Sequence, residues 1–508
     1  MIKSNGGIIG PDNVTTGGAF GTASGVFKLG EVTNLIKDSK WPTAGPQGFQ
    51  VANSCRFNEA SADSLHRATG ETTGSTKWTL STWIKRSTLG SFADGGTFMG
   101  TYASTSKRSQ FAFLDNDKLY WNANNGAGTE GSATTAAVFR DVSAWYHVVL
   151  KIDTTQSSQS DRCKIYVNNV EQSLTFSGAM PAQNEANTGM YGSQYIGASF
   201  YNTGTDRHFG GYLAETVMID NSALEPDQFG EFNSQTGIWV PKSVTGLTFG
   251  TNGFYCDYKD SSALGNDANG SNNLTVTNLT SIDQSTDTCS TNFATMNPLS
   301  NYYNSDAAFS DGNNTVECGG TASAAITSTI GASSGKWYAE FKNISGSGGG
   351  SVFGIESLSY QTGVTHYVGY NSYSWGYFQQ DGKIKNNNSD IATYSSQTNG
   401  DICGIALDLD NNKLYFSKNG TWQNSADPSA GTGGISITAP ASTDTGVYLF
   451  SGSDDNQYAS RTFSSDFGSP VYAISSGNTD GNGFGNFEYA VPSGYLSLNT
   501  KNLAAVLA

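Results

Sequence analysis

Apolar and polar residues alternate along two pairs of neighbouring segments. In residues 145–153, Val148, Leu150 and Ile152 recur at every second position, and a similar segment follows at residues 164–169. A period of two residues is that of a β-strand with one buried face. The sequence therefore predicts that these two segments pair as an antiparallel β-hairpin.

The second pair of segments is closer together. Residues 404–410 alternate in the same way, and Asn411 and Asn412 separate them from an apolar segment at residues 413–416. Asparagine accepts the left-handed backbone conformation that a tight hairpin turn needs. The two hairpins lie far apart, each among other short strand patterns. We therefore predict an all-β chain with at least two antiparallel β-sandwiches in series.

Composition supports this fold class. The chain has 508 residues with 61 Gly, 12% aromatic residues and only 14% charged residues. Abundant glycine indicates many turns, and aromatic side chains can fill the thin core of a sandwich. A length of 508 residues favours several domains over one.

Charge excludes one class of partner. The net charge is −16, and Lys and Arg form no cluster of the kind that neutralises a nucleic-acid backbone. No apolar run is long enough for a membrane span, and residues 1–7 lack the apolar centre of a secretory signal. We expect synthesis in a cytoplasm, no nucleic-acid partner and no membrane insertion.

The six cysteines are dispersed and form no C-x-x-C pair, so the spacing of a metal site is absent. Cys163 and Cys403 lie inside strand patterns, where a thiol usually serves as a small buried apolar group. Free thiols are the main expectation, and a disulfide between some pair is the alternative.

The chain divides into five parts by pattern. We predict an arm at residues 1–45, a first sandwich at 46–245, a connector at 246–300, a second sandwich at 301–472 and a tail at 473–508.

The first sandwich contains the segments W-T-L-S-T-W-I at 78–84, W-Y-H-V at 145–148, I-Y-V-N at 165–168 and G-Y-L-A-E at 211–215. In this order they resemble the LamG-like group of the concanavalin A-like lectin superfamily. The resemblance implies a jelly-roll sandwich of the kind that commonly binds ligands.

The second sandwich contains K-W-Y-A-E-F at 336–341, G-D-I-C-G-I-A-L-D at 400–408 and F-S-K-N-G-T-W at 416–422, in that order. This succession resembles a SPRY domain. The connector, with G-F-Y-C-D-Y at 253–258, is similar to linking segments of tailed-phage virion proteins that carry a LamG-like domain. A segment similar in character to this connector lies near the end of the chain, at residues 487–496.

Catalytic patterns are scarce. The paired carboxylates of concanavalin A-like glycosidases, E-x-D-x-E or E-x-D-x-x-E, are absent. Asp408 and Asp410 share a strand face, but they stand at the second hairpin, where a structural role is expected. Residues 331–335 match G-x-S-x-G in letters only, because a strand rather than a helix follows them. We expect no catalytic residues and no enzyme activity.

Candidate binding residues lie in the second sandwich. Tyr360, His366 and Tyr367 gather aromatic groups that could stack on sugar faces, although packing within the core is the alternative. The LamG-like resemblance implies a calcium ion in some members, for which Asp94 or the Asp115–Asp117 turn could supply oxygens. Acidic turns are usually solvated, so we assign no metal ligand and no cofactor.

These features together favour a tailed-phage virion protein. We expect a tail fibre or receptor-binding protein that displays its sandwiches towards host cell-surface glycan or protein. The arm would contact other virion proteins, and a homo-oligomer, most simply a trimer, is expected. A capsid-decorating or head-fibre protein is the first alternative, and a tail-associated polysaccharide depolymerase is the second.

Overall fold

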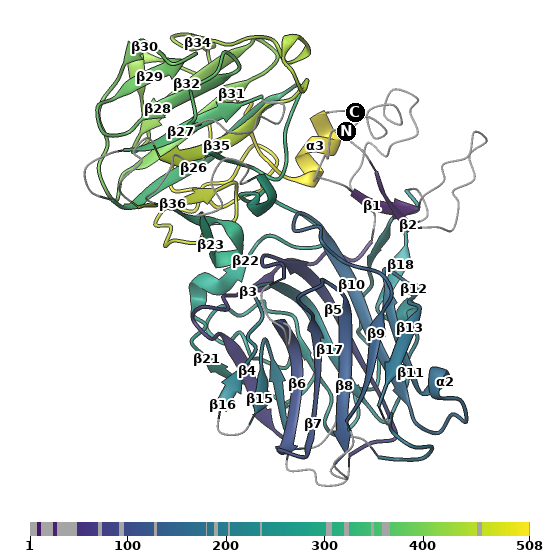
Figure 1. Ribbon diagram of the computed structural model, residues 1–508. Coiled ribbons are helices and arrows are strands. Elements are labelled where there is room, and N and C mark those ends of the chain that lie inside the picture. Colours follow the sequence, from purple (N-terminus) through teal and green to yellow (C-terminus); the bar gives the residue numbers. More distant parts are fainter. Residues whose placement is uncertain are drawn as a thin grey trace, which may run out of the picture. The chain divides into compact units, whose positions relative to one another are not determined.

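The computed structural model describes residues 8–11, 24–27, 48–69, 74–90, 96–125, 130–178, 180–186, 192–201, 204–233, 236–300, 307–319, 325–346, 350–357, 366–454 and 460–506. It contains two compact units, of which the first includes residues 46–290 and the second residues 291–508 (Figure 1). Antiparallel strands form nearly all of both units, which confirms the predicted all-β class. Within the predicted arm, β1 (Ile8–Pro11) and β2 (Ser24–Phe27) pair as a hairpin.

The first unit is built on two large antiparallel sheets. The first sheet has the order β12 (Val170–Glu171), β11 (Cys163–Val167), β10 (Trp145–Asp153), β5 (Lys77–Arg86), β17 (Gly211–Asp220), β3 (Ser54–Phe57) and β22 (Gln284–Ser285), with β20 (Phe254–Cys256) also paired to β17. The second sheet has the order β13 (Leu174–Ser177), β9 (Glu130–Thr135), β8 (Leu119–Asn125), β7 (Lys107–Phe113), β6 (Gly96–Ser104), β14 (Ser193–Ile196), β4 (Ser64–Ala68) and β21 (Thr275–Thr277). Smaller elements are the hairpins β15 (Ser199–Tyr201) with β16 (Gly204–Asp206) and β18 (Gly230–Phe232) with β19 (Trp239–Pro241), and the helices α2 (Gln159–Arg162), η2 (Pro226–Gln228) and η3 (Ser281–Asp283).

The first predicted hairpin is confirmed. Strands β10 and β11 pair in antiparallel register, and Val148, Leu150 and Ile152 face the core between the two sheets, as their alternation predicts. Asn168 and Asn169, with φ of 50° and 67°, form the two-residue turn from β11 to β12. Their left-handed conformation is the one expected of a tight hairpin turn.

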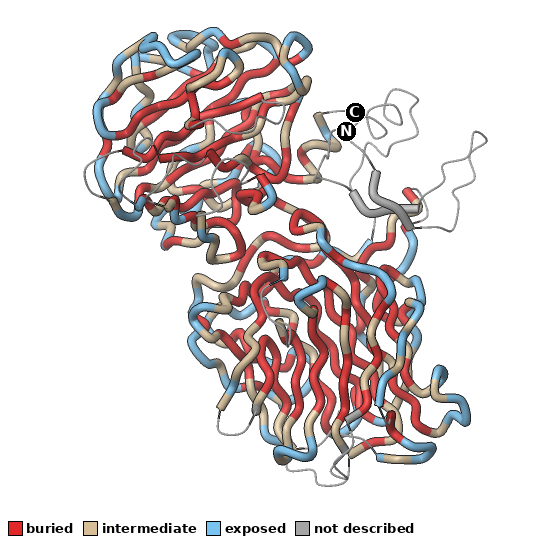
Figure 2. The backbone as a smooth tube through the Cα atoms, in the orientation of Figure 1, coloured by how far each residue is buried: buried red, intermediate tan, exposed pale blue. Residues whose placement is uncertain are grey.

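The outer face of the first sheet is buried as well. Apolar side chains on that face of β5, β10 and β17 pack against residues 221–250 and against Val51, which fold back over them. All ten residues of β17 are buried as a result. Figure 2 shows the strands of both units buried along much of their length, with exposure mainly in the loops. Covering the second face places polar side chains of these strands away from water, where each needs a partner.

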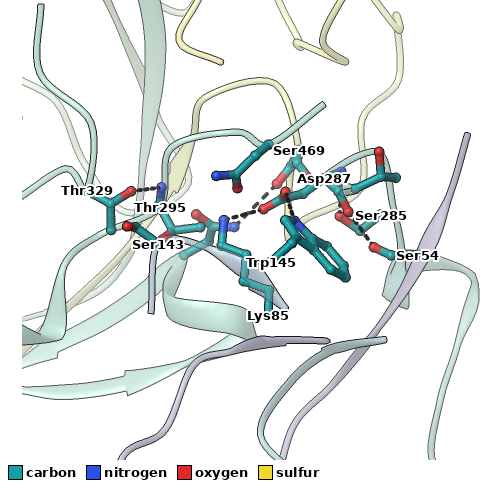
Figure 3. Close-up of polar contacts among 12 residues, drawn as sticks. Ser54, Lys85, Ser143, Trp145, Ser285, Asp287, Thr295, Thr329 and Ser469 are labelled. Atoms are coloured by element: carbon teal, nitrogen blue, oxygen red, sulfur yellow. Dashed lines mark hydrogen bonds and ion pairs between the residues drawn. The ribbon is translucent and has the colours of Figure 1, made fainter. Parts of the chain in front are cut away.

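One such side chain is Lys85 on β5. Its Nζ lies 2.7 Å from Oδ2 of Asp287, and the two side chains are 1% and 0% exposed. The indole N–H of Trp145 donates to the other carboxylate oxygen at 3.1 Å, and Ser54 donates to the Asp287 carbonyl at 2.6 Å (Figure 3). The Asp287 carboxylate thus neutralises the buried ammonium of Lys85. The same contacts hold the segment around Asp287 against the sheet.

His147 is fully buried on the same outer face. Its ring stacks on Trp83 with a centroid distance of 4.8 Å, Trp239 Nε1–H donates to Nδ1 at 3.0 Å, and Nε2 lies 2.8 Å from the Ser81 hydroxyl. With Nδ1 accepting, the neutral ring carries its proton on Nε2 and donates it to Ser81. Burial lowers the pKa of His147 to about 3.

The predicted connector supplies strands to the first unit. Strand β20 pairs with β17, β21 with β4 and β22 with β3, and the compact unit ends at residue 290. Residues 246–290 therefore extend both sheets of the first sandwich, whereas residues 291–300 belong to the second unit.

The second unit is also a sandwich of two sheets. One has the order β23 (Ala308–Ser310), β24 (Thr315–Cys318), β36 (Arg461–Asp466), β26 (Lys336–Ser345), β31 (Ile402–Asp408), β32 (Lys413–Lys418) and β33 (Thr421–Trp422), with β34 (Ile435–Ser436) on β32 and β37 (Leu496–Ser497) on β26. The other has the order β25 (Ala325–Thr327), β35 (Leu449–Asp454), β27 (Ser351–Glu356), β28 (Ser374–Phe378), β29 (Lys383–Asn386) and β30 (Ser389–Thr393). Its helices are η4 (Pro298–Ser300), η5 (Asp311–Asn313), η6 (Gln423–Ser425), η7 (Pro440–Ser442) and α3 (Thr500–Val506).

The second predicted hairpin is β31 with β32. Leu407 lies opposite Leu414, and Asn412 takes the left-handed conformation with φ of 53°. The predicted tail, residues 473–508, contains β37 and α3, and Phe487 and Tyr495 are buried against the outer face of β26 and its neighbours. This sheet, like the first sheet of the first unit, is therefore covered on both sides.

The Lys85–Asp287 pair provides a test of how the covering segment is held. Asp287→Asn leaves a buried ammonium without its counter-charge, and the free energy of unfolding of the first unit should fall by about 3–5 kcal/mol. Replacing both residues, as Lys85→Met with Asp287→Asn, should cost less than the sum of the single changes. Urea unfolding followed by tryptophan fluorescence measures these differences. Asp390→Asn, which removes an exposed partner of Lys383, serves as the control and should leave stability unchanged. Strictly additive losses would contradict the assigned coupling.

His147 gives the first unit a pH dependence. The pKa of His147 is about 3 in the folded chain, below the usual 6.5. Between pH 3 and pH 6.5 the ring is therefore protonated in the unfolded chain and neutral in the folded chain. Stability should therefore fall as the pH drops below 6.5, by on the order of 4 kcal/mol at pH 3. His147→Gln should reduce this slope in urea unfolding at a series of pH values. An unchanged slope in His147→Gln would refute the assignment.

Candidate functional site

The second sheet of the first unit leaves polar side chains on its outer face. Strands β7 and β8 alternate so that Phe111 and Trp121 point into the core while Gln110 and Asn122, which are register partners, point outwards. The backbone N–H of Gln110 donates to Oδ1 of Asn122 at 3.1 Å. Both amide side chains are nearly buried, at 5% and 4% exposure.

The hairpin β15–β16 folds over this outer face. It approaches closely because Gly100 on β6 has no side chain, and a Cβ there would lie 2.7 Å from the carbonyl oxygen of Ala198. The loop after β16 then delivers Arg207 in the left-handed conformation, with φ of 55°. Its Nη1 donates to Oε1 of Gln110 at 2.8 Å, which fixes the guanidinium beside the amides.

These side chains line a shallow surface hollow that opens to solvent and, in this conformation, encloses no space the size of a water molecule. We call it the amide–arginine hollow; its lining residues are Arg108, Ser109, Gln110, Asn122, Ser199, Phe200 and Arg207. The lining contains amides, hydroxyls, two guanidinium groups and one aromatic ring, and no carboxylate. Such a set can accept and donate hydrogen bonds.

Aromatic rings continue from the hollow across the same sheet face. Phe200 packs on Tyr102 with a centroid distance of 4.4 Å and on Tyr195 at 5.7 Å, and Tyr195 stacks on His66 at 4.7 Å. Tyr195 and His66 are register partners on β14 and β4. Burial lowers the pKa of His66, which favours a neutral ring in this row.

The second unit places His366 in a buried polar cluster. Its Nε2 lies 2.8 Å from Oε1 of Glu356, and Asn371 donates to Nδ1 at 3.1 Å. Ser374 and Ser451 donate to the two oxygens of Glu356, at 2.9 and 3.1 Å. His366 has no exposed surface, so in this conformation its ring orders the loop and does not face a ligand.

Tyr367, by contrast, is partly exposed beside the same loop. Its ring packs edge-on against Tyr370 and Phe378, its hydroxyl donates to Asn388, and Lys385 Nζ lies 5.8 Å from the ring centroid. The paired Gly354 and Gly376 of β27 and β28 allow the loop to cross the sheet at Val368. Tyr360, the third predicted residue, lies outside the described residues.

The predicted oxygen donors for calcium lie in different settings. Asp117 is nearly buried and pairs with Arg86 at 3.1 Å and with Arg140 at 2.7 Å, whereas Asp115 is exposed. Asp94 lies outside the described residues. Across the described part of the chain, no group of three or more His, Cys, Asp or Glu side chains could hold a metal ion.

Asp408 and Asp410 have structural partners. Asp408 is buried and pairs with Lys336 at 2.9 Å, and Asp410 accepts the backbone N–H of Gly335 at 2.7 Å. All six cysteines are free, and Cys163 and Cys403 are fully buried. Among the helices described, none is long and apolar enough to cross a membrane.

Sequence reasoning missed the amide–arginine hollow. Gln110 and Asn122 are single polar residues between apolar ones, a pattern that any strand with one wet face shows. The available signal was the outward row of amide, arginine and tyrosine side chains on consecutive predicted strands. Their convergence depends on the register of β7 with β8 and on the hairpin that brings Arg207.

Solved structures similar to parts of the chain include a SPRY domain, a putative carbohydrate binding protein and a pentraxin. The SPRY domain of human HERC1 is 16% identical, with a TM-score of 0.28, over 34% of this chain and 96% of its own. A putative carbohydrate binding protein from Bacteroides ovatus is 18% identical, with a TM-score of 0.32, over 45% of this chain and 58% of its own. A heptameric SAP-like pentraxin from Limulus polyphemus is 13% identical, with a TM-score of 0.27, over 41% of this chain and 94% of its own.

Comparison with family sequences identifies both sandwiches. None of the curated proteins matches the chain. Residues 60–229 match the concanavalin A-like lectin/glucanases superfamily, and residues 336–430 match the SPRY domain family. Both sandwiches that the sequence predicted are confirmed, and the chain carries a concanavalin A-like domain followed by a SPRY domain.

Proposed function

We propose that the protein is a carbohydrate-binding protein and that the amide–arginine hollow of its concanavalin A-like domain is the binding site. The observation that carries this proposal is the set of nearly buried amides beside a guanidinium and an aromatic ring. A sugar presents hydroxyls that both donate and accept hydrogen bonds, together with apolar C–H faces. Amides serve both hydrogen-bonding roles, guanidinium groups donate in pairs, and Phe200 offers an apolar ring face.

The hollow is ordered before any ligand arrives. Gln110 is held from one side by Arg207 and through its backbone by Asn122. Because these side chains lose little conformational freedom on binding, more of the interaction energy is available for affinity.

We further propose that the protein acts on the surface of a tailed-phage particle as a tail fibre or receptor-binding protein. Support comes from the resemblance of the G-F-Y-C-D-Y segment at 253–258 to segments of tailed-phage virion proteins and from two binding-type domains in series. In this proposal residues 1–45 contact other virion proteins, the chain is a homotrimer, and the hollow engages host glycan. The partly exposed ring of Tyr367 beside Lys385 offers a second surface for contact.

Glycan binding is tested with the full-length protein. An array of bacterial polysaccharides identifies a ligand, and calorimetric titration then measures its affinity for the protein and for Arg207→Ala. We expect a loss of about tenfold or more, since a hydrogen bond to a charged group contributes about 1.5–3 kcal/mol. Arg140→Ala removes an exposed guanidinium of the same domain that does not line the hollow, so it is the matched control and should bind as the unchanged protein does. Equal affinity in Arg207→Ala would place the site elsewhere.

The particle proposal predicts both an assembly and a location. Mass photometry should find a species of three times the 53.6 kDa chain mass. Cryo-electron microscopy of particles that contain the chain should show it at the tail, in threefold or sixfold sets. Density spread over the head lattice would instead support a capsid-decorating protein. A monomer in solution would contradict the proposed trimer.

A further inference from the structure

Two buried carboxyl groups face each other on the covered sheet of the SPRY domain. Glu340 on β26 and Asp466 on β36 are direct register partners, so both side chains project from the same, outer, face. Each has 0% exposure. Directly opposed residues in antiparallel strands have Cβ atoms about 4.5–5.5 Å apart, a separation at which two negative charges repel.

The C-terminal segment, residues 470–498, covers this pair. The backbone N–H groups of Tyr489 and Glu488 donate to Oε1 and Oε2 of Glu340, at 2.9 and 3.1 Å, and the Tyr338 hydroxyl donates to Oε1 at 2.9 Å. Phe487 packs edge-on against Tyr338 with a centroid distance of 5.2 Å. Glu340 therefore anchors residues 488 and 489 to the sheet, while β37 of the same segment pairs with β26 further along.

Asp466 receives hydrogen bonds from the backbone of Gly468 and of Ser469. Its Oδ1 accepts the backbone N–H of Gly468 at 2.7 Å, whereas Oδ2 and the nearby Tyr472 hydroxyl are buried with no hydrogen-bond partner among the described residues. Glu340, with three donors, is suited to the ionised form. Asp466, with an unused oxygen, is suited to the neutral acid.

The surrounding groups supply little compensating charge. Tyr338 and Lys342 flank Glu340 on β26, the covering segment brings Tyr472, Glu488 and Tyr489, and Cys403 of β31 lies in the core beneath. Lys342 Nζ stands 4.7 Å from the ring centroid of Tyr472. Within the described residues, neither Glu340 nor Asp466 forms an ion pair with Lys or Arg, so the repulsion is relieved by a proton.

We propose that Glu340 and Asp466 share one proton and that this pair is a pH-dependent latch for the C-terminal segment. With the proton on Asp466, the Glu340 carboxylate holds the backbone of residues 488 and 489. When the proton leaves, two buried anions face each other and the segment detaches. Detachment uncovers the aromatic outer face formed by Tyr338 and Tyr415.

The direction of the pH effect follows from the burial of both groups. Burial raises the pKa of Glu340 to about 7, and burial and then the charge of Glu340 raise that of Asp466. The closed form consequently holds a proton that the open form releases at pH values above the ordinary carboxyl range. The closed form is most stable relative to the open form at or below about pH 4.5. Its stability falls as the pH rises towards 7 and stays constant at pH values above the raised pKa of the pair.

Hydrogen exchange of the full-length protein tests the latch. After correction for the intrinsic rate, the opening equilibrium at the amides of residues 487–489 should rise by up to about tenfold per pH unit between pH 5 and 7, because one proton is released on opening. Asp466→Asn, which mimics the neutral acid, should keep the segment closed and flatten this profile. Asp390→Asn, which alters an exposed carboxylate of the same domain, should keep the profile of the unchanged protein.

Two further measurements decide the case if Asp466→Asn folds poorly. Infrared spectra of the unchanged protein at pH 6 should contain the carbonyl band of a buried neutral carboxylic acid, and this band should vanish on alkaline titration. Absence of the band, or the same exchange profile in Asp466→Asn, would overturn the proposal. Exchange that responds to added calcium or EDTA but not to pH would also overturn it, because the pair would then hold a cation in place of a proton.

Discussion

Each sandwich contains one sheet whose two faces are both buried, and the charges on its second face must be neutralised there. Water cannot solvate them, and an isolated buried charge costs several kcal/mol. In the concanavalin A-like domain, Asp287 neutralises Lys85. In the SPRY domain, backbone N–H groups of the covering segment meet the carboxylate of Glu340. In both domains the covering chain follows the core strands in sequence and is held at a charged side chain.

The second sheet of each domain has a different task. Its core-facing residues pack in the same way, but its outer face keeps partly exposed polar and aromatic groups. The amide–arginine hollow and the Tyr367 loop both lie on such sheets. A sandwich with one sheet sealed and the other partly open combines rigidity with a surface available to a partner. That division of roles is why the proposed binding site depends on β7 and β8 and not on the more deeply buried β5 and β10.

Most of the architecture could be predicted from sequence because it depends on local periodicity. Val148, Leu150 and Ile152 mark a strand by alternation, and Asn412 marks its turn by conformational tolerance. The site could not be predicted in this way. Arg207 reaches Gln110 across 97 positions, and the partner of His366 is a glutamate that no spacing rule selects. The role of residues 246–290 was likewise hidden, because strands of two or three residues carry no readable period.

The position of Asp287 has a consequence for how such domains are inherited. The family match ends at residue 229, yet the counter-charge of Lys85 lies 58 positions further on. A fragment cut at the family limits would expose Trp83 and Trp145 around an unneutralised ammonium. Its wet aromatic surface would favour aggregation over folding. The smallest piece of this chain that recombination can transplant between proteins is therefore the sandwich together with the segment that covers it.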